Sequence, residues 1–99
     1  MNIQFQEKDP QVVLSKIKEA MGDRQLGKMV SFDLSGDEMV VTISKLGTST
    51  LHFKYSQNVQ GTHFVLAKEK IALAHRPMKA DVSAKVLNVI QKAGGVIQA

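Results

Sequence analysis

Basic and imidazole side chains gather in the stretch "AHRPMKADVSAK", residues 74–85. His75, Arg76 and Lys79 stand directly before an expected helix, and the free N–H groups and dipole of a helix N-terminus favour anions. One interpretation is a weak site for an anion or for the carboxylate of an acidic partner. The other is a solvated joint in which Pro77 ends a strand and charge keeps a short loop in water.

Neither a metal site nor a catalytic site is expected. On the expected sheet His52 faces Ala67 and His63 faces Ser56, which separates the two imidazoles by roughly 13 Å. The chain contains no cysteine, and no histidine follows His75 at a spacing of three or four residues, so His75 lacks the further ligands that a metal site needs. No serine stands in a recognisable arrangement with a histidine and an acid. The sequence thus predicts a protein that is not an enzyme and holds no cofactor.

The middle of the chain predicts a hairpin. Alternating apolar residues in "KMVSFDL" and "MVVTISK" flank a two-residue turn at Gly36-Asp37. The register that pairs Ser35 with Glu38 also gathers the apolar side chains on one face. It sets Leu34 across from Met39, Phe32 across from Val41 and Val30 across from Ile43.

The same alternation continues in "TLHFKYS" and "THFVLAK". A turn at Val59-Gln60 pairs Tyr55 with Phe64 and Phe53 with Leu66, and a turn at Lys68-Glu69 pairs Leu66 with Ile71 and Phe64 with Leu73. A three-residue "LGT" loop centred on Gly47 brings Ile43 opposite Leu51. The prediction is a five-stranded antiparallel meander over residues 28–74.

One helix is expected before the meander in the sequence and another after it. Asp9-Pro10 is a typical N-cap and first helical position, and the helix ends at Gly22. A second helix begins near Asp81 and ends at Gly94-Gly95. Their apolar faces carry Val13, Leu14, Ile17 and Met21, and Val82, Val86, Val89, Ile90 and Ala93. Ile3 and Phe5 alternate as a short first strand.

The order strand, helix, five strands, helix predicts one α+β domain over residues 1–99. Its two layers are an antiparallel sheet and two helices on one face. This order is similar to a reduced helix-grip domain of the START and Bet v 1 type, in which the sheet wraps a long C-terminal helix. The similarity is one of topology and implies no functional residue.

A second resemblance covers residues 50–92. "TLHFK", "KIALA" and "HRPMKADVSAKVLNVI" form a strand, a second strand, a short Pro-Lys link and an amphipathic helix. This tail resembles the end of the small bacterial proteins of the polyhydroxyalkanoate system family, although the spacing between its parts differs here. The resemblance implies a likeness of fold and carries no site residue with it.

The outer face of the expected meander is poor in charge. It carries mostly small or mildly apolar side chains, with Asp33, Lys54 and Lys70 as its main charges. A freely solvated sheet face usually carries more, so we expect a partner to cover it. The candidate interface residues are Val40, Thr42, Val65, Ala67 and Ala72.

Charge and composition limit the function classes. The net charge is +4, and there is no cysteine, which fits a reducing, cytoplasmic setting. The first ten residues lack the pattern of a signal peptide, and no apolar run is long enough to cross a bilayer. The lysines are scattered singly and few aromatic residues are available for base stacking, which argues against nucleic-acid binding.

Three functions follow from these observations. The first is a small non-enzymatic binding or assembly module, expected to form a homodimer, that holds a protein partner on its sheet face or in the groove between sheet and C-terminal helix. The second is a carrier of a small apolar ligand under that helix, although a chain of 99 residues has little core to spare for a cavity. The third is a weakly basic nucleic-acid-binding protein.

Overall fold

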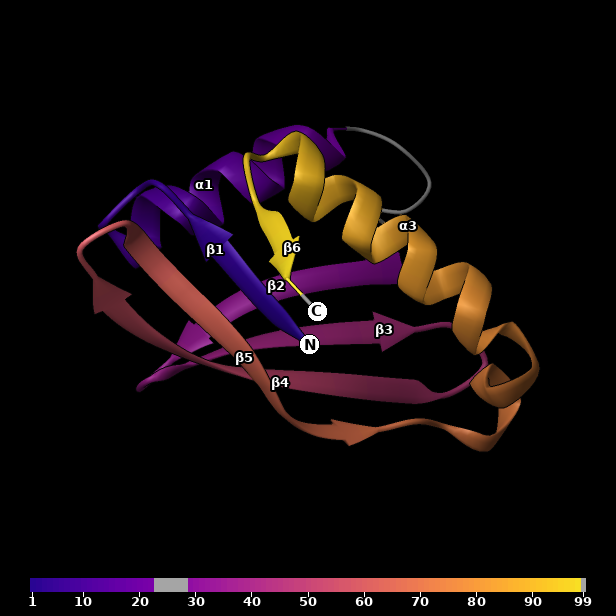
Figure 1. The fold of residues 1–99 in the computed structure, drawn as a ribbon. Helices are drawn as coiled ribbons and strands as arrows, with labels where there is room; N and C mark the ends of the chain where they lie inside the picture. The colour runs from indigo at the N-terminus through magenta and orange to yellow at the C-terminus, as the bar shows by residue number, and fades with distance from the viewer. Residues whose placement is uncertain (23–28, 99) are drawn as a thin grey trace.

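The computed structural model describes residues 1–22 and 29–98 of the chain (Figure 1). The side chains of residues 78, 79, 81 and 82 also lie outside the description. In chain order the elements are β1 (Asn2–Phe5), α1 (Pro10–Met21), β2 (Val30–Ser35), β3 (Glu38–Ser44), β4 (Thr48–Asn58), β5 (Gly61–Lys70), the 3-10 helix η1 (Leu73–Met78), α3 (Lys79–Lys92) and β6 (Val96–Gln98).

The strands form one six-stranded sheet in the order β2-β3-β4-β5-β1-β6, in which all neighbours are antiparallel. Both helices cover the same face of this sheet (Figure 1). The prediction of an α+β fold with two helices on one face of an antiparallel sheet is confirmed. No helix in the described part of the chain is long and apolar enough to cross a membrane.

The β2–β3 hairpin has the predicted register. Ser35 pairs with Glu38, and the three apolar pairs follow as expected from the turn. Gly36 has a φ of 60°, a conformation that glycine adopts readily and that this kind of turn requires. The turn and the apolar alternation therefore fix the same pairing.

The loop between β3 and β4 is displaced by one residue from the prediction. It occupies residues 45–47, so that Ser44 pairs with Thr48. Leu51 consequently lies opposite Val41, and Ser49 takes the place opposite Ile43 that was predicted for Leu51. The predicted pairing of Ile43 with Leu51 is wrong, although each side chain stays on the expected face.

The predicted turn at Lys68-Glu69, and with it a strand over residues 70–74, is wrong. Pairing of Tyr55 with Phe64 and of Phe53 with Leu66 is confirmed, but β5 then continues to Lys70 alongside an equally long β4. A β-bulge between His52 and Phe53 shifts the register, so that His52 pairs with Lys68. Lys-Glu lacks the glycine or asparagine that a tight hairpin turn favours, and the unpaired half of β4 offers β5 a longer ladder.

The first and last strands complete the sheet. β1 lies between β5 and β6, with Ile3 opposite both Phe64 and Ile97. β6 was not predicted, because three residues are too few to show an alternating pattern. Gly61 passes so close to β1 that a Cβ on it would lie 2.0 Å from the carbonyl oxygen of Phe5.

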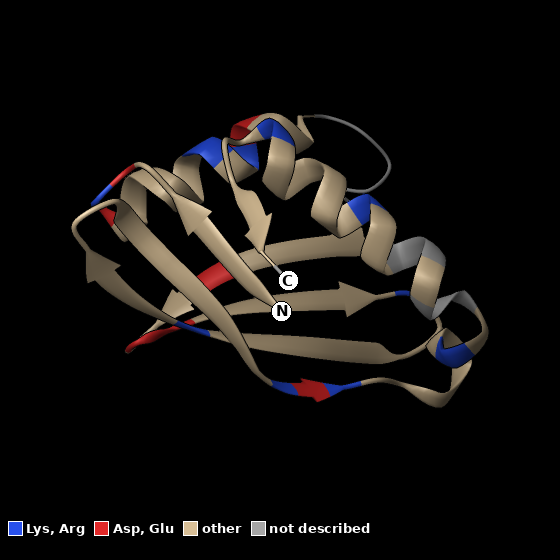
Figure 2. Cartoon of the chain, in the orientation of Figure 1, with Lys and Arg blue, Asp and Glu red and all other residues tan. Residues whose placement is uncertain are grey.

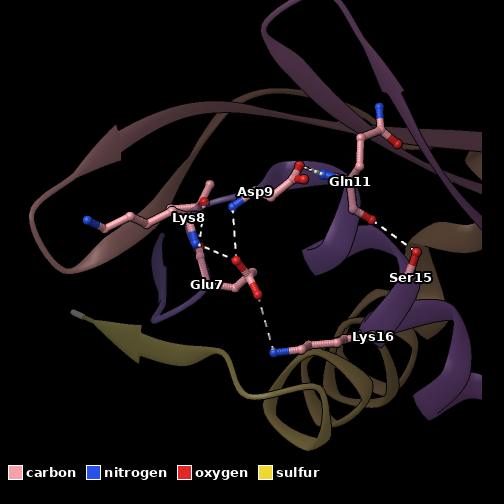
Figure 3. Close-up of polar contacts among 7 residues, drawn as sticks. Glu7, Lys8, Asp9, Gln11, Ser15 and Lys16 are labelled. Carbon is pink, nitrogen blue, oxygen red and sulfur yellow. Dashed lines mark hydrogen bonds and ion pairs between the residues drawn. The ribbon is translucent and has the colours of Figure 1, made fainter.

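Helix α1 begins as predicted. Asp9 is the N-cap and its side chain accepts a hydrogen bond from the backbone N–H of Gln11, at 2.9 Å. Glu7 accepts from the backbone N–H groups of Lys8 and Asp9 and lies 4.0 Å from Lys16 (Figure 3). These bonds satisfy free N–H groups at the entry to the helix.

Helix α3 begins at Lys79, two residues before the predicted cap, because η1 leads directly into it. Pro77, expected to end a strand, lies within η1 instead. Val86, Val89 and Ile90 are buried against the sheet as predicted, whereas the side chain of Val82 lies outside the described residues.

The core fills the layer between the sheet and the two helices. All four phenylalanines of the chain are buried there, and the rings of Phe5 and Phe64 meet edge to face at 5.6 Å between centroids. The inward side chains of five strands and both helices contribute to one cluster. The opposite face of the sheet is covered by none of the described helices (Figure 1).

Candidate binding face

The uncovered face is defined by the outward side chains of the six strands. Pairing and alternation place them in rows that run across the sheet. The principal members are Ser31, Asp33 and Ser35 on β2; Glu38, Val40 and Thr42 on β3; Thr50, His52, Lys54 and Ser56 on β4; His63, Val65, Lys68 and Lys70 on β5; Asn2 and Gln4 on β1; and Val96 and Gln98 on β6.

The centre of this outer face carries no acidic or lysine side chain. Val40 and Thr42 on β3 lie beside His52 and Thr50 on β4, and all four residues are half-buried by their neighbours in the sheet. Val65, farther along β5, is 39% exposed. The centre therefore lacks the carboxylate and ammonium groups that are most costly to dehydrate, although its hydroxyls and imidazole still need hydrogen-bond partners when they are covered.

Charges lie on either side of that centre (Figure 2). Asp33 lies on β2 and Glu38 on β3, whereas Lys68 and Lys70 lie at the C-terminal end of β5. Lys54 of β4 pairs with Glu38 across the strands. The acidic side chains thus belong to the β2–β3 half of the face and the basic ones to the β4–β5 half.

His52 is the imidazole nearest the centre of the outer face. Its Nδ1 lies 3.7 Å from Oε1 of Glu38, and both side chains are about one third exposed or less. The prediction that His52 faces Ala67 is wrong because of the bulge, while that of His63 facing Ser56 is confirmed. Among the described residues, no three His, Cys, Asp or Glu side chains gather closely enough to hold a metal ion.

The predicted interface residues divide into two groups. Val40, Thr42 and Val65 lie on the outer face at their predicted places. Ala67 is the extra residue of the bulge, exposed and without a partner in the pairing with β4. Ala72 is not on the sheet, since β5 ends at Lys70, and its placement in the outer face is a wrong prediction.

The joint between β5 and α3 is built around a buried histidine. His75 is 4% exposed; its Nδ1 lies 2.5 Å from Oγ of Ser49 and its Nε2 contacts the carbonyl oxygen of Lys45. A carbonyl only accepts, so Nε2 carries a proton, and in the neutral ring Nδ1 then accepts from the Ser49 hydroxyl. Oγ of Ser49 also accepts from the N–H of Ala72 at 2.8 Å.

This geometry removes His75 from the predicted anion site. Both of its ring nitrogens are occupied within the protein, so its ring does not face solvent as the sequence suggested. Arg76 is exposed, and the side chain of Lys79 lies outside the described residues. The structure therefore does not bring His75 and Arg76 together around a common point.

The Ser49–His75 pair also has limited scope for catalysis. A serine hydroxyl that donates to an oriented imidazole is the arrangement of an activated nucleophile. Ser49 is 0% exposed, however, and the histidine is held by a backbone carbonyl, with no acid. In this conformation no substrate can reach the hydroxyl.

Sequence reasoning missed Ser49, although a signal for it exists. It shares the odd-numbered alternation of Leu51 and Phe53, which places it on the helix-covered face. A hydroxyl on that face needs a hydrogen-bond partner. That rule requires a polar partner for Ser49 but does not identify His75.

Two small hollows lie under α3. One, of about 20 Å³, is lined by Ile43, Ser49, Leu51, Ile71, His75, Ser83 and Val86. The other, of about 40 Å³, is lined by Met1, Leu51, Phe53, Leu66, Glu69, Ser83, Val86 and Leu87. They share three lining residues and are therefore neighbours. Each has room for one or a few water molecules, and neither holds an organic ligand as it stands.

A larger, shallow hollow of about 480 Å³ lies at the β1–β6 end of the outer face, lined by Gln4, Gln6, Gln60, Val96 and Gln98. The amides of Gln4 and Asn58 hydrogen-bond to each other in both directions, at 2.9 and 3.2 Å. The lining carries no charged side chain. This hollow extends the uncharged part of the face to the edge of the sheet.

Comparisons of the chain with protein-family models, with curated proteins and with solved structures find no match. The resemblance of residues 50–92 to the polyhydroxyalkanoate system family, and the likeness to a helix-grip domain, therefore remain predictions. What the fold defines is a two-layer α+β domain whose sheet has one face covered by helices and one face open.

Proposed function

We propose that the protein is a small non-enzymatic binding module that holds a protein partner on the open face of its sheet. The observation that carries this proposal is the half-buried centre of that face around Val40, Thr42, Thr50 and His52, four positions that hold no Asp, Glu, Lys or Arg. Charged side chains are the usual means of keeping a sheet surface in water and free of partners. Their absence from the centre favours a surface that is covered in use.

The positions of the charges support the same conclusion. Protein interfaces have a core depleted of charge and a polar rim. The centre of this face is flanked by Asp33 and Glu38 on one side and by Lys68 and Lys70 on the other. A partner seated on the centre would leave these charges near its boundary, where they set orientation more than affinity.

The experiment that tests this function compares the two sides of the molecule. A photo-crosslinking amino acid is introduced at Thr42 on the open face and, as a control, at the exposed Ser15 of α1. In cells that express the protein, we expect one adduct of defined mass from Thr42 and none from Ser15. Equal labelling from both positions, or adducts from Ser15 alone, would contradict the proposal.

A second candidate is a carrier of a small apolar ligand. It is favoured by the two adjoining hollows under α3, whose walls are largely apolar. Their volumes place it second, because a ligand would first have to displace side chains such as Leu51 and Val86. Native mass spectrometry is the test. A stoichiometric bound molecule that is lost in Ser83→Trp but kept in Ser15→Trp would favour the carrier over the binding module.

Nucleic-acid binding finds less support. All five aromatic residues lie in the described part of the chain; the four phenylalanines are buried, and Tyr55 is half-buried with its hydroxyl donating to the carbonyl of Gly36. No aromatic ring is thus presented for stacking on a base.

We further propose that the protein acts in the cytoplasm, which is consistent with a chain that has no cysteine.

A further inference from the structure

The outward charges of β2 to β5 are arranged with opposite signs about the line between β3 and β4. In one row across the sheet, Asp33 on β2 and Lys68 on β5 each lie on the second strand from that line, with Val40 and His52 between them. In the next row, Glu38 on β3 lies beside Lys54 on β4. Each of these acidic positions therefore has a basic position the same number of strands away on the other side of the line.

Such an arrangement is complementary to itself. Two sheets that pack face to face can be related by a two-fold axis that lies between them, parallel to the strands. An axis along the β3–β4 line exchanges β2 with β5 and β3 with β4 between the two copies. Asp33 of each copy then meets Lys68 of the other, and Glu38 meets Lys54.

We propose that the partner on the open face is a second copy of this chain, related by a two-fold axis that runs along the line between β3 and β4. This inference rests on the proposed function and names its partner. The same axis places Val40 over His52 and Thr42 over Thr50, so that the uncharged centre is buried against itself. Strands of the two sheets stay roughly aligned, as in other packed sheets.

The remaining charges near the face are compatible with this axis. Lys70 lies at the same distance from the line as Ser31 and therefore meets a neutral side chain. Glu69 pairs with Leu51, on the helix side of the sheet, and Asp37 lies in the β2–β3 turn. No pair of like charges among the outward residues of β2 to β5 is brought face to face.

The test uses two charge reversals, each of which should weaken dimerisation alone, whereas a mixture of the two variants should dimerise. In Asp33→Lys, both symmetric contacts become lysine against lysine, and in Lys68→Glu both become acid against acid. We expect each variant to raise the dimer dissociation constant at least about tenfold in sedimentation velocity, because like-charge juxtaposition opposes association. An equimolar mixture of the two should form a 1:1 heterodimer at wild-type affinity, since both contacts are then attractive.

The control is Lys18→Glu, which makes the same change of net charge as Lys68→Glu but on an exposed residue of α1. It should self-associate as the wild type does. A wild type that dimerises while Asp33→Lys and Lys68→Glu also dimerise normally, or a mixture that fails to restore association, would overturn the proposed axis.

Failure of the inference is distinguishable from failure of the proposed function. A wild type that stays monomeric up to about 100 µM, well above the micromolar range of ordinary weak complexes, would exclude the homodimer. If the photo-crosslinker at Thr42 then captures a different protein and the one at Ser15 does not, the open face binds a partner, and only the proposal of a homodimer is refuted. If the photo-crosslinker at Thr42 gives no specific adduct either, both the homodimer and the proposed binding function are refuted.

Discussion

The hydroxyl of Ser49 and the imidazole of His75 lie 26 residues apart in the sequence and 2.5 Å apart in the fold. The bond joins β4 to η1, and the second nitrogen of the same ring joins η1 to the loop after β3. One side chain thereby fixes the start of α3 relative to two other segments. Because the pair is buried, bulk water cannot freely replace a lost bond.

His75→Ala should therefore lower the free energy of unfolding by about 1–3 kcal/mol, the usual effect of leaving a buried hydrogen-bonding group without its partner. Ser49→Ala should have a similar effect, and the double variant should cost less than the sum of the two. Chemical denaturation measures all three. Arg76→Ala, the neighbouring exposed residue, is the control and should change stability by no more than about 1 kcal/mol. Additive effects of the two buried substitutions would show that the pair does not act as a unit.

Phe53→Ala should lower the free energy of unfolding by about 3–5 kcal/mol, because it empties the volume of a ring at the centre of the core. Phe53 is 1% exposed and lies between Met39 and Leu66 in the sheet. The denaturation midpoint is the measurement, and Lys18→Ala, at an exposed position of α1 away from both the core and the open face, is the control. A midpoint equal to that of the wild type would contradict the placement of Phe53 in the core.

Val40→Ala should weaken self-association more than it weakens the fold. Each copy loses two carbon atoms from the centre of the open face, so two copies lose four, which at about 0.8 kcal/mol per buried methylene amounts to about 3 kcal/mol. Full burial would thus correspond to a rise in dissociation constant of roughly a hundredfold. The unfolding free energy of the monomer should fall by less than about 1 kcal/mol. Sedimentation across concentration and denaturation at low concentration separate the two quantities. A large loss of stability with unchanged association would place Val40 in the core instead.

Gly61→Ala should be far more damaging than Gly36→Ala, although both glycines lie in hairpin turns with positive φ. At Gly61, with φ 138°, a methyl group would meet the backbone of β1, whereas at Gly36 nothing lies within 4 Å. Gly36→Ala should cost about 1 kcal/mol, the usual penalty for a left-handed residue with a side chain. Gly61→Ala should exceed that several-fold or separate β1 from β5, which hydrogen exchange of the β1 amides would show. Equal midpoints for the two variants would refute the close approach.

The parts of the fold that sequence predicted well are those with two concurrent signals. The β2–β3 register follows both from the turn at Gly36-Asp37 and from the apolar alternation, and α1 follows both from its cap and from its periodicity. The end of β5 had only an alternating pattern and no turn residue, and there the prediction failed. A β-bulge changes the alternation without any mark in the sequence, so His52 and Lys68 could not be paired beforehand.

The candidate site shows the same division. Val40, Thr42 and Val65 were placed on the open face by alternation alone, since that face depends only on parity. His75 was misplaced because its burial depends on Ser49 and Lys45, which are remote in sequence. The balance of charge about the β3–β4 line likewise requires the register of four strands, and it emerges only when the bulge is known.

The position of β1 has a consequence for how the chain folds during synthesis. β1 precedes the other described strands in the chain, yet its two neighbours are β5 and β6, so that Asn2 can pair with Val65 and Gln98 only after more than sixty further residues have been synthesised. The hairpins of β2 to β5 close over short stretches and can assemble early, whereas joining β1 to them requires closure of a long loop. Until then Ile3 and Phe5 lack the strands that they pair with, and we expect the addition of β1 to the sheet to be a late step of folding.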